Sequence, residues 1–406
     1  MMIMNLALRL LVAAAFLAAI LSALAVAMLE SPIGVILPLE QMALGGAVAG
    51  TLLGAAACWR GRARSARGVI RVAVVTIVIG SLAGVLAARK TFLAYEKLPV
   101  TVSSGGVTLA GDIYVPRGAG SGVPAAVLVH GSGRETRSEY AFYARFLARR
   151  GIAALAYDKR GAGASQGHTY DGGYQTYADD AAHAFRLLQG TPGIDASRVG
   201  FVGFSEAEWV APLAATQVAT PAFLVIIGAS GLTPANQTLE EVDLRLARKD
   251  FGGQDREEAR LLYSALLQYQ RSAILPDGLA ARLQAAMHQP WFAAAEDLPE
   301  EIYPPEDYRW WRGVMDFDAA PLLSQLACPM LFVKGELDDR SDAALSRERI
   351  LAAAGEDARR RVQFELYPGA DHSILRWPLG HRVPPPAFPE GFPERISSWI
   401  LGRRSG

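Results

Sequence analysis

One serine of the chain stands where its hydroxyl could act as a nucleophile. Ser205 follows the short apolar, Val- and Phe-rich run at residues 199–204, and a run of helix-forming residues begins directly after it. A strand that turns sharply into a helix at a serine exposes the hydroxyl above the sheet. The first free N–H groups of the helix then point at the group that the serine attacks. The pattern therefore favours Ser205 as a nucleophile.

A second serine fits the literal Gly-x-Ser-x-Gly motif but lacks this setting. Ser165 lies in Gly-Ala-Ser-Gln-Gly, well after the preceding predicted strand, and a polar, glycine-rich loop follows it. No helix N-terminus is available there to stabilise an oxyanion. Ser205 departs from the motif only at Ala207, where one methyl group is added at the position of the second glycine. We therefore expect Ser205, and not Ser165, to be the nucleophile.

A serine nucleophile needs a base, and the base needs a carboxylate that orients it. Of the six histidines, His372 has the best setting, because it follows the predicted strand at 362–366 in a loop that can reach over the sheet edge. The strand before that one ends in Gly-Glu-Leu-Asp-Asp, which makes Asp338 the predicted acid and Asp339 the alternative. The chain order of serine, aspartate and histidine is one that serine hydrolases use.

The same chemistry requires two N–H donors for the charge that develops on the substrate oxygen. Glu206, the residue after the predicted nucleophile, supplies one from its backbone. The quartet His-Gly-Ser-Gly at residues 130–133 follows another predicted strand, about 75 residues before Ser205. We expect the backbone N–H of Ser132 to be the second donor.

From residue 98 onward, strand-like and helix-like segments alternate. Strands are predicted at 100–103, 107–115, 125–129, 152–157, 199–204, 223–227, 330–333 and 362–366. Helices are predicted at 140–150, 177–188, directly after Ser205, at 342–354 and at 396–401. This alternation predicts an α/β fold with a mostly parallel sheet and helices on both faces.

About a hundred residues separate the strands at 223–227 and 330–333, far more than a simple crossover needs. We interpret residues 232–325 as a helical cap inserted over the carboxyl edge of the sheet. Helices are predicted within it at 239–249, 256–272 and 279–288. The tryptophans Trp291, Trp310 and Trp311 either line an acyl pocket or form the core of the cap itself.

The first ninety residues are of a different kind. Residues 10–29, 42–59 and 72–88 are uncharged or nearly so, and each run is close to the length that crosses a bilayer. They predict a membrane segment of about three helices, although the first run could be a cleaved signal peptide. The glycines of the second and third runs recur every four residues, at 46, 50 and 54 and at 80 and 84. Such small-residue ridges let helices approach closely in lipid.

The charges around these runs predict an orientation. Five arginines lie between the second and third runs, at positions 60, 62, 64, 67 and 71, whereas residues 30–41 contain no Lys or Arg. The positive-inside rule then places the arginine loop in the cytoplasm and everything after residue 90 on the other side of the membrane. Formal net charge is zero, which argues against a nucleic-acid partner. Neither metal-ligand spacing nor a nucleotide fingerprint is evident, so no cofactor is expected.

Residues 98–403 resemble the α/β-hydrolase superfamily, nearest to esterases of the dienelactone-hydrolase and serine-aminopeptidase-like branch. The matching motifs are the quartet at 130–133, Tyr-Asp-Lys-Arg-Gly-Ala-Gly-Ala-Ser at 157–165, Gly-Phe-Ser at 203–205, Gly-Glu-Leu-Asp at 335–338 and Gly-Ala-Asp-His at 369–372. The resemblance implies that the loop at 158–165 is structural. It also implies Gly-Gly where this chain has Ala207-Glu208.

These observations lead to one main expectation and two alternatives. We expect a membrane-anchored serine hydrolase that cleaves small-molecule carboxylic esters through Ser205, His372 and Asp338, without a cofactor. The same triad would also serve a peptidase or amidase. A non-catalytic, membrane-tethered binding protein of the same fold is the other alternative, and the departure at Ala207 and Glu208 is the only hint in its favour.

Overall fold

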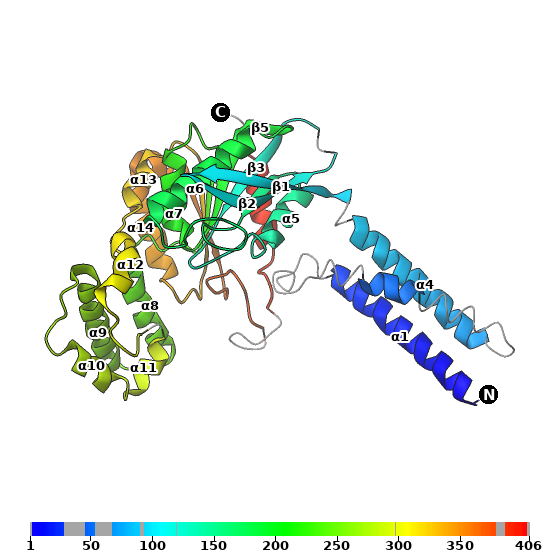
Figure 1. The fold of residues 1–406 in the computed structure, drawn as a ribbon, viewed down its shortest axis with the longest axis horizontal. Helices are drawn as coiled ribbons and strands as arrows, with labels where there is room; N and C mark the ends of the chain where they lie inside the picture. The colour runs from blue at the N-terminus through cyan, green and yellow to red at the C-terminus, as the bar shows by residue number, and fades with distance from the viewer. Residues whose placement is uncertain are drawn as a thin grey trace.

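The computed structural model describes residues 2–27, 45–52, 67–89, 93–118, 120–296, 298–378 and 386–403. Its centre is one sheet of eight strands in the order β1-β2-β4-β3-β5-β6-β7-β8 (Figure 1). The strands are β1 (Tyr95–Ser104), β2 (Val107–Pro116), β3 (Val123–Val129), β4 (Ala153–Tyr157), β5 (Ile194–Phe204), β6 (Leu224–Ile227), β7 (Met330–Gly335) and β8 (Val362–Tyr367). Every predicted strand of the hydrolase domain is present.

The direction of the strands determines where the loops gather. β2 is antiparallel to both β1 and β4, and all pairs from β4 through β3 to β8 are parallel. The carboxyl ends of parallel strands lie at the same edge of a sheet. The loops that follow β3, β5, β7 and β8, which carry the predicted site residues, therefore meet at that edge.

Helices cover both faces of the sheet, as the alternation predicted. They are α5 (Ala141–Arg149), α6 (Gly173–Gln189), α7 (Ala207–Thr216), α14 (Ala343–Arg359) and α15 (Phe392–Leu401). Successive strand residues point to opposite faces. Val127 and Phe201 accordingly pack in the core beneath α6, α7 and α14, whereas Leu128 and Val202 pack in the core beneath α5 and α15.

The residues between β6 and β7 form a helical insertion with a core of its own. Its elements are α8 (Pro234–Arg248), α9 (Gly253–Ser272), α10 (Leu279–Ala286), α11 (Pro290–Ala295), the 3-10 helix η2 (Pro305–Tyr308), α12 (Arg309–Val314) and α13 (Ala320–Gln325). Helix α8 begins five residues before the predicted start at 239. The side chain of Thr233 caps it by accepting from the N–H of Asn236, and Pro234 suits its first turn.

The N-terminal part contains α1 (Met2–Ala27), a helical stretch at 45–52 and α4 (Arg67–Ala88). Figure 1 shows α1 and α4 projecting away from the sheet. The glycine ridges lie where these helices touch: a Cβ on Gly50 would lie 3.2 Å from the backbone N of Ala19, and one on Gly80 would lie 3.1 Å from Oγ1 of Thr51. Within the described residues, however, no helix combines the length and apolarity needed to cross a bilayer. The three predicted spans are thus not confirmed. Residues 28–29 of the first run, residues 42–44 and 53–59 of the second, the loop at 30–41 and the arginines at 60, 62 and 64 lie outside the described residues.

Candidate active site

The turn after β5 holds Ser205 in a backbone conformation that few residues adopt. Its φ is 52°, in the left-handed region, and its N–H donates to the carbonyl of Ile227 at 2.8 Å. Helix α7 begins two residues later, at Ala207. A non-glycine residue at positive φ is strained, and such strain is typical of a nucleophile on a strand-to-helix turn.

The neighbours of Ser205 show why this turn fits. A Cβ on Gly203 would lie only 2.6 Å from Cβ of Ala207, so position 203 has no room for a side chain. The bare backbone of Gly203 in turn leaves space for the methyl group of Ala207, which is fully buried. The departure from the second glycine is therefore accommodated within the turn.

Ser205, His372 and Asp338 form one chain of hydrogen bonds. The Oγ of Ser205 lies 2.9 Å from Nε2 of His372, and Nδ1 of His372 lies 2.9 Å from Oδ2 of Asp338. In this arrangement Nδ1–H donates to the carboxylate, and Nε2 is left to accept the serine proton. The three residues come from the loops after β5, β8 and β7, as the sequence predicted.

Asp338 is buried and ionised. Burial by itself raises the pKa of its carboxyl, but His372 and Lys334 outweigh that effect and hold the pKa well below its usual range. Nζ of Lys334 donates to Oδ2 of Asp338 at 2.8 Å, to Oγ of Ser341 at 2.7 Å and to the carbonyl of Ala229 at 3.0 Å. Lys334 is not among the residues predicted from the sequence, although a lysine within the apolar run of β7 is a signal of a buried partner.

Of the two residues predicted to supply oxyanion donors, Ser132 lines one cavity with Ser205, and Glu206 follows Ser205 in the chain. Gly131 packs against the turn, since a Cβ on it would lie 3.4 Å from the carbonyl oxygen of Phe204. The N–H of Gly131 donates to the hydroxyl of Tyr140 at 2.7 Å. In contrast, the N–H groups of Ser132 and Glu206 donate to no group within the described residues. Both are thus available to an oxygen next to Ser205.

Glu208 takes a structural position that the sequence did not indicate. Its carboxylate accepts from the N–H of Ser230 at 2.7 Å, from the hydroxyl of Ser230 at 2.8 Å and from the N–H of Gly231 at 3.0 Å. Burial raises its pKa to about 7, against the opposing effect of these hydrogen bonds. Glu208 thus ties α7 to the loop that follows β6.

The rival residues are used elsewhere. Oγ of Ser165 donates to the carbonyl of Asp158 at 2.7 Å and accepts from the N–H of Ala110 at 3.0 Å, so it holds the loop after β4. Asp339 lies 3.6 Å from the guanidinium of Arg245. Asp371, the carboxylate adjacent to His372 in the sequence, accepts from Nε1 of Trp377 at 2.7 Å and from backbone N–H groups of its own loop.

A cavity of about 470 Å³ opens beside Ser205 and His372, a volume that suits a small organic molecule. Its apolar wall is formed by Tyr140, Tyr143, Phe204, Trp209, Ile227, Leu375 and Phe388, and its polar lining includes Ser132, Glu135, Glu139, Gln237 and Arg340. Gln237 belongs to α8, so the insertion contributes to this wall.

The tryptophans proposed for an acyl pocket do not line this cavity. Trp291 is 2 % exposed and packs in the core of the insertion. Trp310 packs against the rings of Tyr170 and Tyr174, and Trp311 packs between the insertion and the core of the sheet. The expectation of a cap core is therefore confirmed for Trp291 and in part for Trp311, whereas Trp310 belongs to the core of the sheet.

The sequence of this chain is similar to a known protein family and to a curated protein. A model of the X-Pro dipeptidyl-peptidase (S15) family matches residues 105–347, a range that includes Ser132, Ser205 and Asp338 and ends before His372. The chain is 32% identical over 139 residues to the polyketide transferase claH of Penicillium crustosum. The aligned segment covers 33% of this chain and 44% of the transferase. The chain therefore spans less than half the length of that curated relative.

Solved structures with similarity to this chain share less of its sequence. The hypothetical protein PA2218 from Pseudomonas aeruginosa is 19% identical with a TM-score of 0.48, over 77% of this chain and 94% of that one. The Pyrococcus furiosus esterase PF2001 is 18% identical with a TM-score of 0.45, over 78% and 94%. The proline iminopeptidase of Mycobacterium smegmatis is 17% identical with a TM-score of 0.48, over 75% and 98%.

The strand order and the position of the turn after β5 confirm the α/β-hydrolase fold predicted from the sequence. The family model covers more than half of the 406 residues. It contains the nucleophile turn and the residue that the structure places as the triad acid. This chain belongs to the X-Pro dipeptidyl-peptidase (S15) family.

Proposed function

We propose that this serine hydrolase cleaves carboxylic esters through an acyl-enzyme on Ser205. His372 removes the serine proton through Nε2 as Oγ attacks the ester carbonyl, and Asp338 stabilises the imidazolium that forms. His372 then gives the proton to the leaving alkoxide. A water molecule, deprotonated by the same nitrogen, releases the acid and restores Ser205.

The charge of each tetrahedral intermediate would be stabilised by two backbone donors. Ser132 lines the same cavity as Ser205 and Glu206 follows Ser205 in the chain, and the N–H groups of both have no partner within the described residues. Preorganised donors of this kind stabilise the transition state more than the substrate, because the oxygen gains charge only during the reaction.

The observation that supports the proposal best is the hydrogen-bonded chain from Ser205 through His372 to Asp338 at the mouth of the cavity. A binding protein without catalysis would need neither this alignment nor the strained φ of Ser205. The unbroken series of hydrogen bonds from Ser205 to Asp338 therefore favours an enzyme over the non-catalytic alternative.

A peptidase is the second candidate, because the chain belongs to a family named for X-Pro dipeptidyl-peptidase activity. An amide nitrogen leaves only after protonation, whereas an alkoxide or phenolate leaves more readily. A triad that cleaves amides therefore cleaves activated esters as well, while the reverse does not follow. Ester hydrolysis is the activity that both candidates share.

Purified protein tests the choice between the two. We expect kcat/KM for p-nitrophenyl acetate or butyrate to exceed that for an X-Pro p-nitroanilide, and Ser205→Ala to abolish both. A dipeptidyl anilide cleaved faster than every ester would assign the chain to the peptidases instead. The Ser205→Ala variant also measures the background hydrolysis that any folded protein surface provides.

We also propose that the N-terminal part attaches the enzyme to a lipid bilayer, with the hydrolase domain outside the cytoplasm. The support comes from the three apolar runs and from the arginines at 60–71. Large apolar side chains are exposed on α1 and α4, at Phe16, Leu17, Ile20, Leu21 and Leu24 of α1 and at Val74, Val75, Val78, Leu82, Val85 and Leu86 of α4. Apolar surface of this extent is a feature of partner or membrane contacts.

A further inference from the structure

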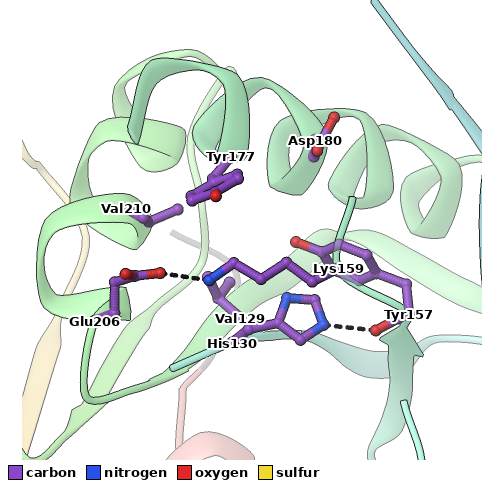
Figure 2. Close-up of a pocket in the computed structure, with 8 residues that line it drawn as sticks. All are labelled: Val129, His130, Tyr157, Lys159, Tyr177, Asp180, Glu206 and Val210. Carbon is purple, nitrogen blue, oxygen red and sulfur yellow. Dashed lines mark hydrogen bonds and ion pairs between the residues drawn. The ribbon is translucent and has the colours of Figure 1, made fainter. Parts of the chain in front are cut away.

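Lys159 is a buried lysine to which the triad mechanism gives no role. It follows β4, and only 4 % of it is exposed. Its Nζ donates to the carbonyl of Gly131 at 2.9 Å and to Oε1 of Glu206 at 2.5 Å. The same nitrogen lies 4.5 Å from the ring centroid of Tyr177. Figure 2 shows the lysine extended from beside Tyr157, at the end of β4, to Glu206 before the start of α7, with its ammonium at the carboxylate of Glu206.

The two acceptors belong to the backbone units that offer the oxyanion donors. The carbonyl of Gly131 and the N–H of Ser132 are parts of one planar, trans peptide group, in which they point in opposite directions. A donor that fixes the carbonyl therefore also fixes the direction of the N–H. It polarises the peptide group as well, which strengthens donation from the nitrogen.

The second contact acts on the other donor. Glu206 carries its oxyanion N–H and its carboxylate on the same residue, and Nζ of Lys159 binds that carboxylate. Both partners are buried, with side chains 5% exposed. One ammonium thus connects the two loops whose N–H groups must converge on a single oxygen.

Further contacts leave the Gly131–Ser132 peptide little freedom. The N–H of Gly131 donates to the hydroxyl of Tyr140, which in turn donates to the carboxylate of Glu135. The backbone N–H of Lys159 donates to the carbonyl of Glu135 at 3.0 Å. The loop after β3 is therefore held at both ends of Gly131, and Lys159 holds the end that leads to Ser132.

His130 contributes to the same arrangement without acting as a base. It lies at the end of β3, and its Nε2–H donates to the carbonyl of Tyr157 at 2.5 Å. Burial, and next the charge of Lys159, lower its pKa to about 3, so its ring is neutral. The cation that contacts Gly131 and Glu206 is accordingly Lys159.

We propose that Lys159 is a positioning residue of the oxyanion hole, which aligns the N–H groups of Ser132 and Glu206 through one buried ammonium. The inference rests on the proposed acyl-enzyme mechanism and adds a residue to it. A purely structural role for the Lys159–Glu206 pair would affect folding alone. A positioning role affects the transition state more than substrate binding.

Lys159→Met tests this role, because methionine keeps most of the volume and removes the donor. Arg160→Met is the matched control. Arg160 is the next residue in the chain and is also buried, and it binds the buried carboxylate of Asp180 and the carbonyl of Ser104, away from both oxyanion loops. Both variants lose a buried cation, so both report the general effect of that loss.

Three quantities are measured on each variant with a p-nitrophenyl ester, after active sites have been counted with a fluorophosphonate. They are kcat, KM and the inhibition constant of a trifluoromethyl ketone, whose adduct with serine carries an oxyanion. For Lys159→Met we expect kcat to fall by roughly 10- to 100-fold with little change in KM. We expect the ketone to bind weaker by a similar factor. Arg160→Met should leave all three values, per active site, near those of the wild type.

Either of two results would overturn the proposal: an unchanged kcat per active site in Lys159→Met, or a reduced kcat with wild-type affinity for the ketone. If Lys159→Met does not fold, Lys159→Met/Glu206→Met replaces the pair by apolar side chains and still lacks the donor to Gly131. The same loss is expected of it, and wild-type kcat there would refute the role. An inactive wild type with an unlabelled Ser205 would refute the proposed function itself, which is a separate result.

Discussion

The carboxylate of Asp338 accepts three hydrogen bonds, from the ring of His372 and the ammonium of Lys334 at Oδ2 and from the backbone N–H of Arg340 at Oδ1. Lys334 is fully buried, and Asp338 is 1 % exposed. Ion pairs in such positions add little net stability over apolar replacements, but removal of one partner leaves an uncompensated charge. We infer that Lys334 keeps the carboxylate ionised and aimed at His372, so that the base has one orientation.

Lys334→Met should therefore destabilise the protein strongly. We expect the free energy of unfolding to fall by about 3–5 kcal/mol near pH 7, as measured by urea denaturation. The low folded pKa of Asp338 adds stability that is present above the ordinary value of 3.8 and disappears as the pH falls below it. The decrease in the free energy of unfolding caused by Lys334→Met should accordingly become smaller in acid. Lys334→Met/Asp338→Asn should be more stable than Lys334→Met, because it leaves no unpaired buried charge. A single variant as stable as the wild type would show that the pair is dispensable.

At the scale of residues, the sequence was most informative where chemistry requires a fixed chain order. Ser205, Asp338 and His372 each follow a predicted strand, and parallel strands bring such positions together. The contacts of Lys159 and Lys334 were not predictable in this way. Each lysine reaches a partner on a neighbouring strand or loop, and the choice of partner depends on side-chain packing that no spacing reveals.

At the scale of elements, α7 links the nucleophile to the loop that enters the insertion. Glu208, in the first turn of α7, binds Ser230 and Gly231 directly after β6. Its carboxylate has no direct cationic partner within the described residues, and its raised pKa of about 7 follows from burial. The charge that Glu208 carries at neutral pH therefore costs stability while it holds the loop in place.

Glu208→Gln should remove this cost. A carboxyl whose pKa rises from 4.5 to about 7 on folding binds more protons in the native state, so wild-type stability falls as the pH rises through that window. We expect the variant to lack this decline, with a gain over the wild type that grows to about 3 kcal/mol by pH 8. Glutamine can accept both N–H groups through its oxygen and donate to the serine hydroxyl. Parallel stability curves for the two proteins between pH 5 and pH 8 would contradict the assignment.

The boundaries of elements were less predictable than their existence. β1 begins at Tyr95, before the predicted start at 100, because β2 extends to Pro116 and pairs along its whole length. β5 begins at Ile194 because it pairs with Val123 of β3. These extensions depend on a partner strand, and partners are not visible in a local pattern.

At the scale of the whole molecule, the hydrolase domain and the N-terminal helices have separate surfaces. The hydrolase domain buries its apolar side chains in the cores of the sheet and of the insertion. The N-terminal helices α1 and α4, in contrast, expose apolar side chains. Sequence patterns separated the two parts at residue 90 because their compositions differ sharply.

The membrane proposal predicts how the full chain fractionates. Expressed in a bacterial host, it should stay in the membrane pellet after a carbonate wash, and protease added to intact spheroplasts should digest the hydrolase domain. A known cytoplasmic protein in the same cells is the control for leakage. Recovery of the full chain in the soluble fraction would contradict attachment, and protection from the protease would contradict the orientation.

The central claim is that Ser205 is an activated nucleophile, and covalent labelling measures this most directly. A fluorophosphonate probe should label the folded wild type once per chain, with the label on the peptide that contains Ser205. Ser205→Ala should lose all labelling and all esterase activity, whereas Ser165→Ala should keep the label. A Ser205→Ala protein that is still labelled and still active, or a wild type that does not react, would contradict the account.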